Sequence, residues 1–124
     1  MTPAQAKKAI PSDDQVVGKA VLKAAGYLGI NNRILSKIIG ISEPSVSRLA
    51  NGTFTLSEKP FELSVLLIRL YRSLDAIVGG DHEVARSWLR NRNTALAGVP
   101  IELIQRISGL TDVIAYLDAR RAVV

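Results

Sequence analysis

The fold is decided by residues 35–51, which read LSKIIGISEPSVSRLAN. The stretch opens with three apolar residues at helical spacing, and Gly40 then interrupts the pattern in the way that ends a helix. Ile41 follows as a buried turn residue, and Ser42 can cap a second helix by accepting a backbone N–H. The stretch therefore predicts two short helices joined by a tight turn. The three apolar residues of the first helix are Leu35, Ile38 and Ile39.

The second helix, expected over residues 43–50, combines a short apolar seam with a polar outer face. Val46 and Leu49 are three residues apart and are expected to face inward, which leaves mainly small and charged side chains facing outward. Small side chains allow a helix to enter the major groove of DNA, and Arg, Ser and Asn can hydrogen-bond base edges. The pattern therefore predicts a DNA recognition helix. The residues expected to contact DNA are Arg33, Lys37, Ser42, Glu43, Ser45, Ser47, Arg48 and Asn51.

Three positions around the turn fit the geometry of a helix-turn-helix. The unit requires a small residue in the first helix, a glycine at the turn, and an apolar residue in the second helix that packs against both. Ser36, Gly40 and Val46 supply these residues at the required spacing. The alternative is a helix-turn-helix kept only as a scaffold for protein contacts. If the unit binds DNA, base edges would be read by Ser47 and Arg48, and phosphates would be held by Arg33 and Lys37.

Positive charge is concentrated in the half of the chain that carries this motif. Sixteen basic and eleven acidic residues give a net charge of +5 and a pI of about 9.9. Residues 1–59 hold eight basic and four acidic side chains, a net charge of +4, whereas residues 60–124 hold eight and seven, a net charge of +1. A basic surface around a helix-turn-helix suits contact with DNA phosphates.

The remaining composition favours a small all-α protein. With 124 residues the chain forms one domain or two very small ones, and 48% apolar residues with few prolines favour helices around an aliphatic core. The absence of cysteine excludes disulfides and thiolate sites. The N-terminal sequence has no apolar segment of signal-peptide length, and the longest apolar runs are too short to span a membrane. We therefore expect a cytoplasmic protein with no membrane contact.

Glycine and proline divide the rest of the chain. We expect a polar arm over residues 1–14, a helix-turn-helix domain over residues 15–59 and a second helical domain over residues 60–124. A long helix over residues 61–78 would bridge the two domains, because leucine recurs there at spacings of three and four and Pro60 is tolerated in a first helical turn. The other expected helices cover residues 14–28, 32–39, 81–90, 100–107 and 111–121. Inward-facing residues of this half include Ile77, Val84, Trp88 and Ile107, with Gly109 at a turn.

No group of residues points to catalysis or to a metal. His82 is the single histidine and has no partners at ligand spacing, so we expect it to be a solvated surface residue. Gly79 and Gly80 lack the following Lys-Ser/Thr of a phosphate-binding loop. We therefore expect no enzymatic activity, no cofactor and no metal. The cluster of Arg86, Arg90 and Arg92 could pair with acidic residues of a partner, and simple solvation is the alternative.

Two stretches together resemble a known family. Residues 31–56 resemble the Xre-type helix-turn-helix, and residues 85–121 are similar to the toxin-binding domain of Xre/ParS-type antitoxins. The second pattern is a Trp-Leu helix, a polar loop, a proline that starts an apolar helix, and a glycine before a closing helix. The matching residues are Trp88, Leu89, Asn93, Leu96, Gly98, Pro100, Leu103, Gly109, Val113 and Leu117.

The resemblance implies an antitoxin of a type II toxin–antitoxin pair. Its partner would be a toxin with a RES domain, of ADP-ribosyltransferase-like fold. Such a toxin consumes NAD or transfers a group from it. The C-terminal domain would block the active site of this toxin, and a homodimer would repress the shared operon through its two recognition helices. By matching position, toxin contact is implied for Tyr116, Arg120, Arg121, Ala122, Val123 and Val124. The alternative is a helix-turn-helix regulator whose C-terminal half only dimerises.

Overall fold

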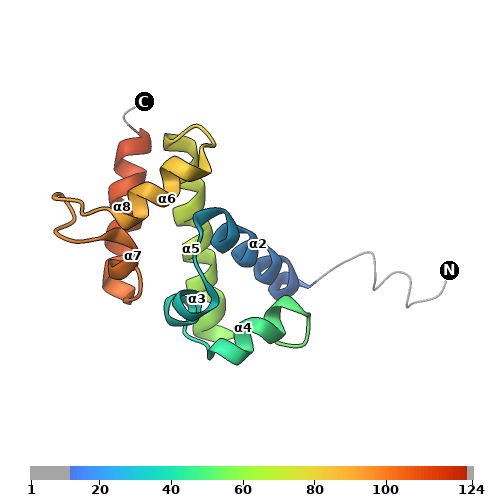
Figure 1. Cartoon of the computed structure of the whole chain (residues 1–124). Helices are drawn as coiled ribbons and strands as arrows, with labels where there is room; N and C mark the ends of the chain where they lie inside the picture. The colour runs from blue at the N-terminus through green and yellow to red at the C-terminus, as the bar shows by residue number, and fades with distance from the viewer. Residues whose placement is uncertain (1–11, 123–124) are drawn as a thin grey trace.

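The computed structural model describes residues 12–122, and this part of the chain forms seven α-helices and no β-strand (Figure 1). The predicted all-α fold is therefore confirmed. The arm residues 1–11 and the last two residues, Val123 and Val124, lie outside the described residues. The helices are α2 (Asp13–Leu28), α3 (Asn32–Ile39), α4 (Glu43–Ala50), α5 (Glu58–Ile77), α6 (His82–Arg90), α7 (Pro100–Leu103) and α8 (Ile107–Ala122).

The helix-turn-helix is formed by α3 and α4, as predicted, and its ends are fixed by local chemistry. The side chain of Asn31 accepts a hydrogen bond from the amide of Ile34 at 2.8 Å and so caps the start of α3. Gly40 ends α3 with φ of 74°, in the left-handed region that glycine enters without steric cost. Ser42 then accepts from the amide of Ser45 at 3.2 Å and starts α4. The tight turn between the two helices is therefore set by Gly40, which ends α3, and by Ser42, which caps α4.

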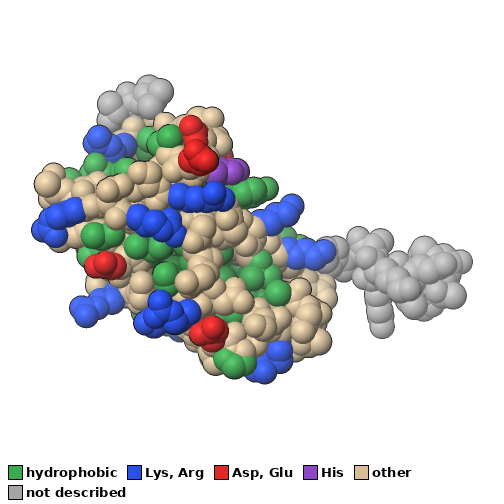
Figure 2. All heavy atoms as spheres, viewed as in Figure 1, with side chains coloured by type: hydrophobic (Ala, Val, Ile, Leu, Met, Phe, Trp, Pro, Cys, Tyr) green, Lys and Arg blue, Asp and Glu red, His purple; other side chains and the backbone are tan. Residues whose placement is uncertain are grey.

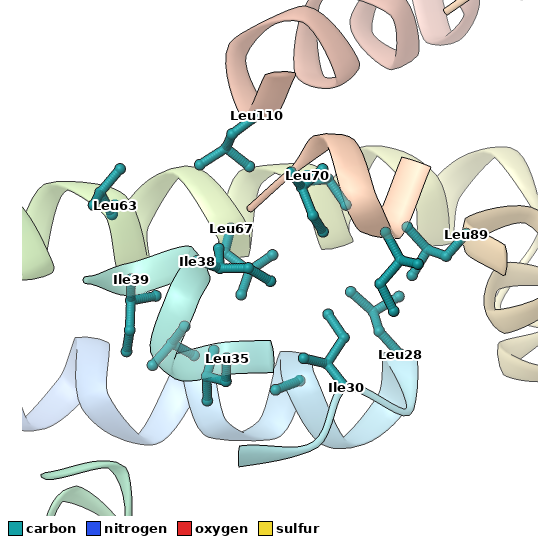
Figure 3. Packing of buried hydrophobic residues seen from close by; sticks show 14 of the residues in the cluster. Leu28, Ile30, Leu35, Ile38, Ile39, Leu63, Leu67, Leu70, Leu89 and Leu110 are labelled. Atoms are coloured by element: carbon teal, nitrogen blue, oxygen red, sulfur yellow. The ribbon is translucent and has the colours of Figure 1, made fainter. Parts of the chain in front are cut away.

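The long helix α5 is the structural centre of the molecule. It lies between α2 on one side and α8 on the other, and α3 also packs against it (Figure 1). Figure 3 shows buried side chains of these helices and of α6 pointing into one shared interior, where Leu67 and Leu70 of α5 are fully buried. One core therefore runs through both halves of the chain, with α5 contributing to each of them.

The boundaries of three helices differ clearly from the predicted ones. Helix α7 ends at Leu103 and not at residue 107. Helix α5 begins at Glu58, with Pro60 inside its first turn, where the missing N–H of proline has no helical partner to lose. Helix α8 begins at Ile107, so Gly109 lies inside its first turn and not between two helices. A Cβ atom at Gly109 would overlap the carbonyl oxygen of Leu103. The glycine therefore serves a close approach of α7 and α8, and its predicted role at a turn was wrong.

Three residues expected in the core lie at the surface. The exposed fractions are 49% for Val84, 59% for Ile107 and 40% for Ile77. Helix α6 buries only Ala85 and Leu89, because one narrow side of this short helix contacts the rest of the molecule. Helical periodicity therefore predicted burial less well near helix ends than in the middle of α5. Within residues 12–122, no helix is both long enough and apolar enough to cross a membrane.

Candidate nucleic-acid and protein interfaces

The recognition helix α4 presents a polar face to solvent. Val46 is fully buried and Leu49 is 9% exposed, as predicted, whereas Glu43, Ser47 and Arg48 are exposed. Helix α4 is short and ends in a turn at residues 51 and 52, so little structure covers its outer face. This arrangement has the shape that a helix needs to approach a DNA groove.

Ser45 does not face outward, which corrects the prediction for this residue. Its exposed fraction is 6%, and its hydroxyl lies 2.7 Å from the hydroxyl of Ser42. The guanidinium of Arg48 donates to the same Ser45 hydroxyl at 3.0 Å. Ser42 is occupied as the helix cap, because caps at this position must turn their oxygen toward the backbone. Ser42 and Ser45 therefore hold the side chain of Arg48, which stays exposed beyond them.

Asn51 is only partly available for a base contact. Its side-chain oxygen accepts from the hydroxyl of Thr53 at 2.6 Å and from the amide of Thr53 at 3.3 Å. An Asn that reads adenine needs both its oxygen and its NH2 group. The oxygen of Asn51 therefore stabilises the turn after α4, and its NH2 group can still donate to a phosphate or a base.

The two residues expected to hold phosphates lie together on α3. Arg33 and Lys37 are exposed and four residues apart, so they share one side of the helix. Figure 2 shows further Lys and Arg side chains spread over the visible face, with few acidic ones between them. Together with the exposed side of α4, the side of α3 that carries Arg33 and Lys37 is the candidate DNA-binding surface.

A second candidate surface lies at the C-terminal part of α8. The ring of Tyr116 stacks on Trp88 of α6, with ring centroids 6.2 Å apart and planes inclined by 20°. The guanidinium of Arg120 lies over the ring of Tyr116, 5.1 Å from its centroid. Trp88 is half-buried and packs against the core, so it belongs to the core and to the surface at once. This stack, with Arg121 and Ala122 exposed beyond it, forms the described part of the expected toxin contact.

A polar cluster that the sequence did not reveal joins α8 to α5. The hydroxyl of Ser73 donates to the carboxylate of Asp118 at 2.7 Å, and Arg69 pairs with the other oxygen of the same carboxylate. Arg121 donates to Ser73 at 3.4 Å. The hydrogen bond from Ser73, and after it the contact with Arg69 and the nearby charge of Arg121, lower the pKa of Asp118. Arg121 is therefore tied to α5 as well as open to a partner.

Arg86 and Arg90 serve the fold, which differs from both alternatives considered for them. Arg90 donates to the carbonyl oxygens of Leu28 at 3.2 Å and of Gly29 at 2.6 Å. Arg86 donates to the carbonyl of Tyr27 at 2.9 Å. These carbonyls lie at the C-terminal end of α2, where a helix has no further amides of its own to offer. We call Arg86 and Arg90 the arginine clamp.

His82 is half-buried, which corrects the prediction of a solvated residue. Its ring stacks on Tyr27 of α2 with centroids 4.3 Å apart. Its Nε2 atom lies 3.3 Å from the hydroxyl of Tyr71 and 3.5 Å from a carboxylate oxygen of Asp75, both on α5. Burial, and after it the charge of Asp75, raise the pKa of Tyr71. This group therefore ties α2, α5 and α6 together. Within the described residues, no cluster of His, Cys, Asp and Glu side chains could hold a metal ion.

Two family models match the chain and between them span both surfaces. Residues 7–69 match the Xre-like helix-turn-helix domain of antitoxins, and residues 73–122 match the C-terminal toxin-binding domain of Xre/MbcA/ParS antitoxins. No curated protein matches the sequence in a direct comparison. The first model covers α2, α3, α4 and much of α5, and the second covers α6, α7 and α8. The chain therefore belongs to the Xre-like antitoxins and is a DNA-binding antitoxin of the type II class with a C-terminal domain for its toxin.

Proposed function

We propose that the toxin partner carries a RES domain of ADP-ribosyltransferase-like fold and that the antitoxin neutralises it by covering its NAD site. The observation that carries the proposal is the match of residues 73–122 to a toxin-binding domain in the same chain as the antitoxin helix-turn-helix. The resemblance of residues 85–121 to the antitoxins of RES systems supports the choice of toxin. Both matched domains are described by what they bind, which supports a role in binding for the antitoxin.

The toxin contact is assigned to the C-terminal part of α8 and the residues that follow it. Tyr116 and Arg120 offer an aromatic ring and a charge at one place, a combination typical of residues that dominate protein interfaces. Arg121 and Ala122 extend this surface toward the end of the chain. Val123 and Val124 complete the assigned contact as an apolar tip.

The DNA contact is assigned to the exposed sides of α3 and α4. Ser47 and Arg48 would reach base edges, Arg33 and Lys37 would hold phosphates, and Glu43 and Asn51 would lie at the border of the interface. A homodimer would place two recognition helices about 34–36 Å apart, which is one turn of DNA. The expected result is repression of a palindromic operator in the cytoplasm.

Co-expression with the neighbouring gene product tests the toxin arm. The RES-type toxin should co-purify with the full-length antitoxin, and its consumption of NAD should stop in the complex. Arg120→Glu should weaken the complex, whereas Arg33→Glu, a matched change on the exposed side of α3, should leave it intact. If the neighbouring product is not of RES type, or if the two proteins fail to associate, the proposed partner is wrong.

Binding to the upstream DNA separates this proposal from a regulator whose C-terminal half only dimerises. Both kinds of protein should bind the operator with an affinity that falls as salt rises. Only the antitoxin should also bind the toxin at its C-terminal half. A protein that represses its operon normally but never rescues cells from the toxin would favour the plain regulator.

A further inference from the structure

One side of α5 is not covered by any described helix, and we call it the α5 face. Its centre is apolar, and Val65 there is 43% exposed. Acidic residues lie toward its N-terminal end and arginines toward its C-terminal end. All its members are exposed or half-buried and recur at helical spacing. They are Glu58, Phe61, Glu62, Val65, Ile68, Arg69 and Arg72.

The charges on this face are symmetric about its centre. Glu58 and Arg72 lie seven residues before and seven residues after Val65. Glu62 lies three residues before Val65 and Arg69 four residues after it, so this pair is symmetric to within one residue. Seven residues fall within about 20° of two full helical turns, so Glu58 and Arg72 lie on the same side of the helix as Val65, and Glu62 lies on the same side as Arg69. The face therefore has opposite charges at matched distances from an apolar middle.

Such a face is complementary to a second copy of itself in the antiparallel direction. Antiparallel pairing about Val65 sets Glu58 of one copy against Arg72 of the other, and each contact occurs twice by symmetry. One residue from exact register, the same pairing brings Glu62 near Arg69 and Phe61 near Ile68. Glu62 also pairs with Lys59, and Arg69 with Asp118, within each copy. Parallel pairing would instead bring like charges together, which is destabilising. The arrangement therefore favours one orientation.

The surroundings of the face leave room for a second copy, and its outer charges, Glu58 and Arg72, have no ion-pair partner among the described residues. A shallow groove of about 490 Å³ runs beside the face, between α5 and the end of α8, and is lined in part by Val65, Ile68 and Arg72. Side chains of a second copy can enter this groove.

From this symmetry we propose that the α5 face is the contact between the two copies of the antitoxin homodimer. The inference rests on the homodimer of the proposed function and is independent of the identity of the toxin. The dimer is held by the paired charges at its rim and by the apolar centre around Val65.

Charge reversal tests the interface in the full-length chain by sedimentation velocity over a range of concentrations. Glu58→Arg and Arg72→Glu should each raise the dimer dissociation constant by about tenfold or more, because each replaces two attractive contacts by two repulsive ones. A mixture of the two variants should dimerise as the unmodified protein does, because each copy then meets opposite charges. Arg92→Glu, a matched change in the loop after α6, should have no effect.

Three other outcomes are possible, and each contradicts a different part of the proposal. A wild-type protein that is monomeric at every concentration would contradict both the homodimer and this interface. A dimer that both variants leave unchanged would contradict the interface and keep the homodimer. Variants that dissociate but fail to recombine in the mixture would show that the charges do not pair across the contact. Co-purification with the toxin is unaffected by any of these results and tests the neutralising function separately.

Discussion

The hydroxyl of Ser73 donates a 2.7 Å hydrogen bond to the carboxylate of Asp118 and so joins α5 to α8 at the level of the expected toxin contact. Ser73 is almost fully buried, and Asp118 lies where Arg69 and Arg121 also converge. The hydrogen bond from this hydroxyl is strengthened by the negative charge of the carboxylate and weakens when the acid is neutral. The relation therefore makes the contact between the two helices sensitive to acid.

We predict that Asp118 stabilises the fold at neutral pH and ceases to do so in acid. Its pKa is lowered below the ordinary 3.8, chiefly by the hydrogen bond from Ser73. The stabilisation is therefore complete above the pKa of the unfolded chain and is lost as the pH falls through the lowered value. Urea unfolding at a series of pH values measures this dependence. Asp118→Asn should reduce the slope in acid, whereas Asp112→Asn, an exposed change on the same helix, should not.

Two glycine-to-alanine substitutions should have opposite effects. At Gly109 the added Cβ overlaps the carbonyl of Leu103, so α7 and α8 must separate, and Gly109→Ala should cost about 2–3 kcal/mol in the free energy of unfolding. At Gly26, inside α2, the added Cβ meets nothing within 4 Å. Gly26→Ala should therefore stabilise the protein by about 0.5–1 kcal/mol through helix propensity. Denaturant unfolding of both variants measures the two changes in the free energy of unfolding. Changes of the same sign would contradict the close approach of α7 and α8.

Removal of the arginine clamp should loosen the end of α2. Arg90→Ala leaves the carbonyls of Leu28 and Gly29 without their donors and should cost about 1–2 kcal/mol. Hydrogen exchange locates the effect, because the amide of Ile30, which bonds to the carbonyl of Ala25 at 2.8 Å, should exchange faster. Arg90→Lys should not rescue the variant, since an ammonium group lacks the fork that reaches both carbonyls. Faster exchange across the whole chain would point to global destabilisation instead.

The DNA contacts predict two distinct signatures. Arg48→Ala should cost about 1–3 kcal/mol of operator binding and relax sequence preference, whereas Lys37→Ala should reduce the slope of log K against log salt by about 1. Titration of labelled operator and of unrelated DNA at several salt concentrations measures both effects.

Ser45 provides a control for how Arg48 is held. Because the Ser45 hydroxyl accepts from Arg48 at 3.0 Å, Ser45→Ala should weaken specific binding without changing the salt slope. If Ser45→Ala behaves as wild type, the buried hydroxyl does not position the arginine.

The predictable part of this molecule lies where local chemistry determines structure. Gly40 and Ser42 fixed the turn of the helix-turn-helix because a left-handed residue and a cap act within a few residues. The apolar spacing of α5 fixed the central helix in the same way. Val46 and Leu49 were assigned to the core correctly because helical periodicity determines which side of so short a helix can be buried.

The unpredicted part depends on contacts between distant segments. Serine is usually a surface residue. The burial of Ser45 is favourable because its hydroxyl forms hydrogen bonds with Ser42 and Arg48. The sequence gives no sign that Arg86 will meet the end of α2, some sixty residues away. Glycine is common in turns, so Gly109 was predicted at one. Its actual role depends on how closely the backbone of Leu103 passes it. Tertiary contacts of this kind have no periodic signature in the chain.

The arginine clamp also limits how the two halves of this antitoxin can be exchanged. A chimera that takes its toxin-binding half from another protein would gain a new partner, but it would lose the donors that cap α2 unless its own α6 carried arginines at the positions of Arg86 and Arg90. The toxin-binding half thus stabilises α2 of the DNA-binding half. Recombination between such proteins is therefore expected to succeed when α2 and α6 are inherited together.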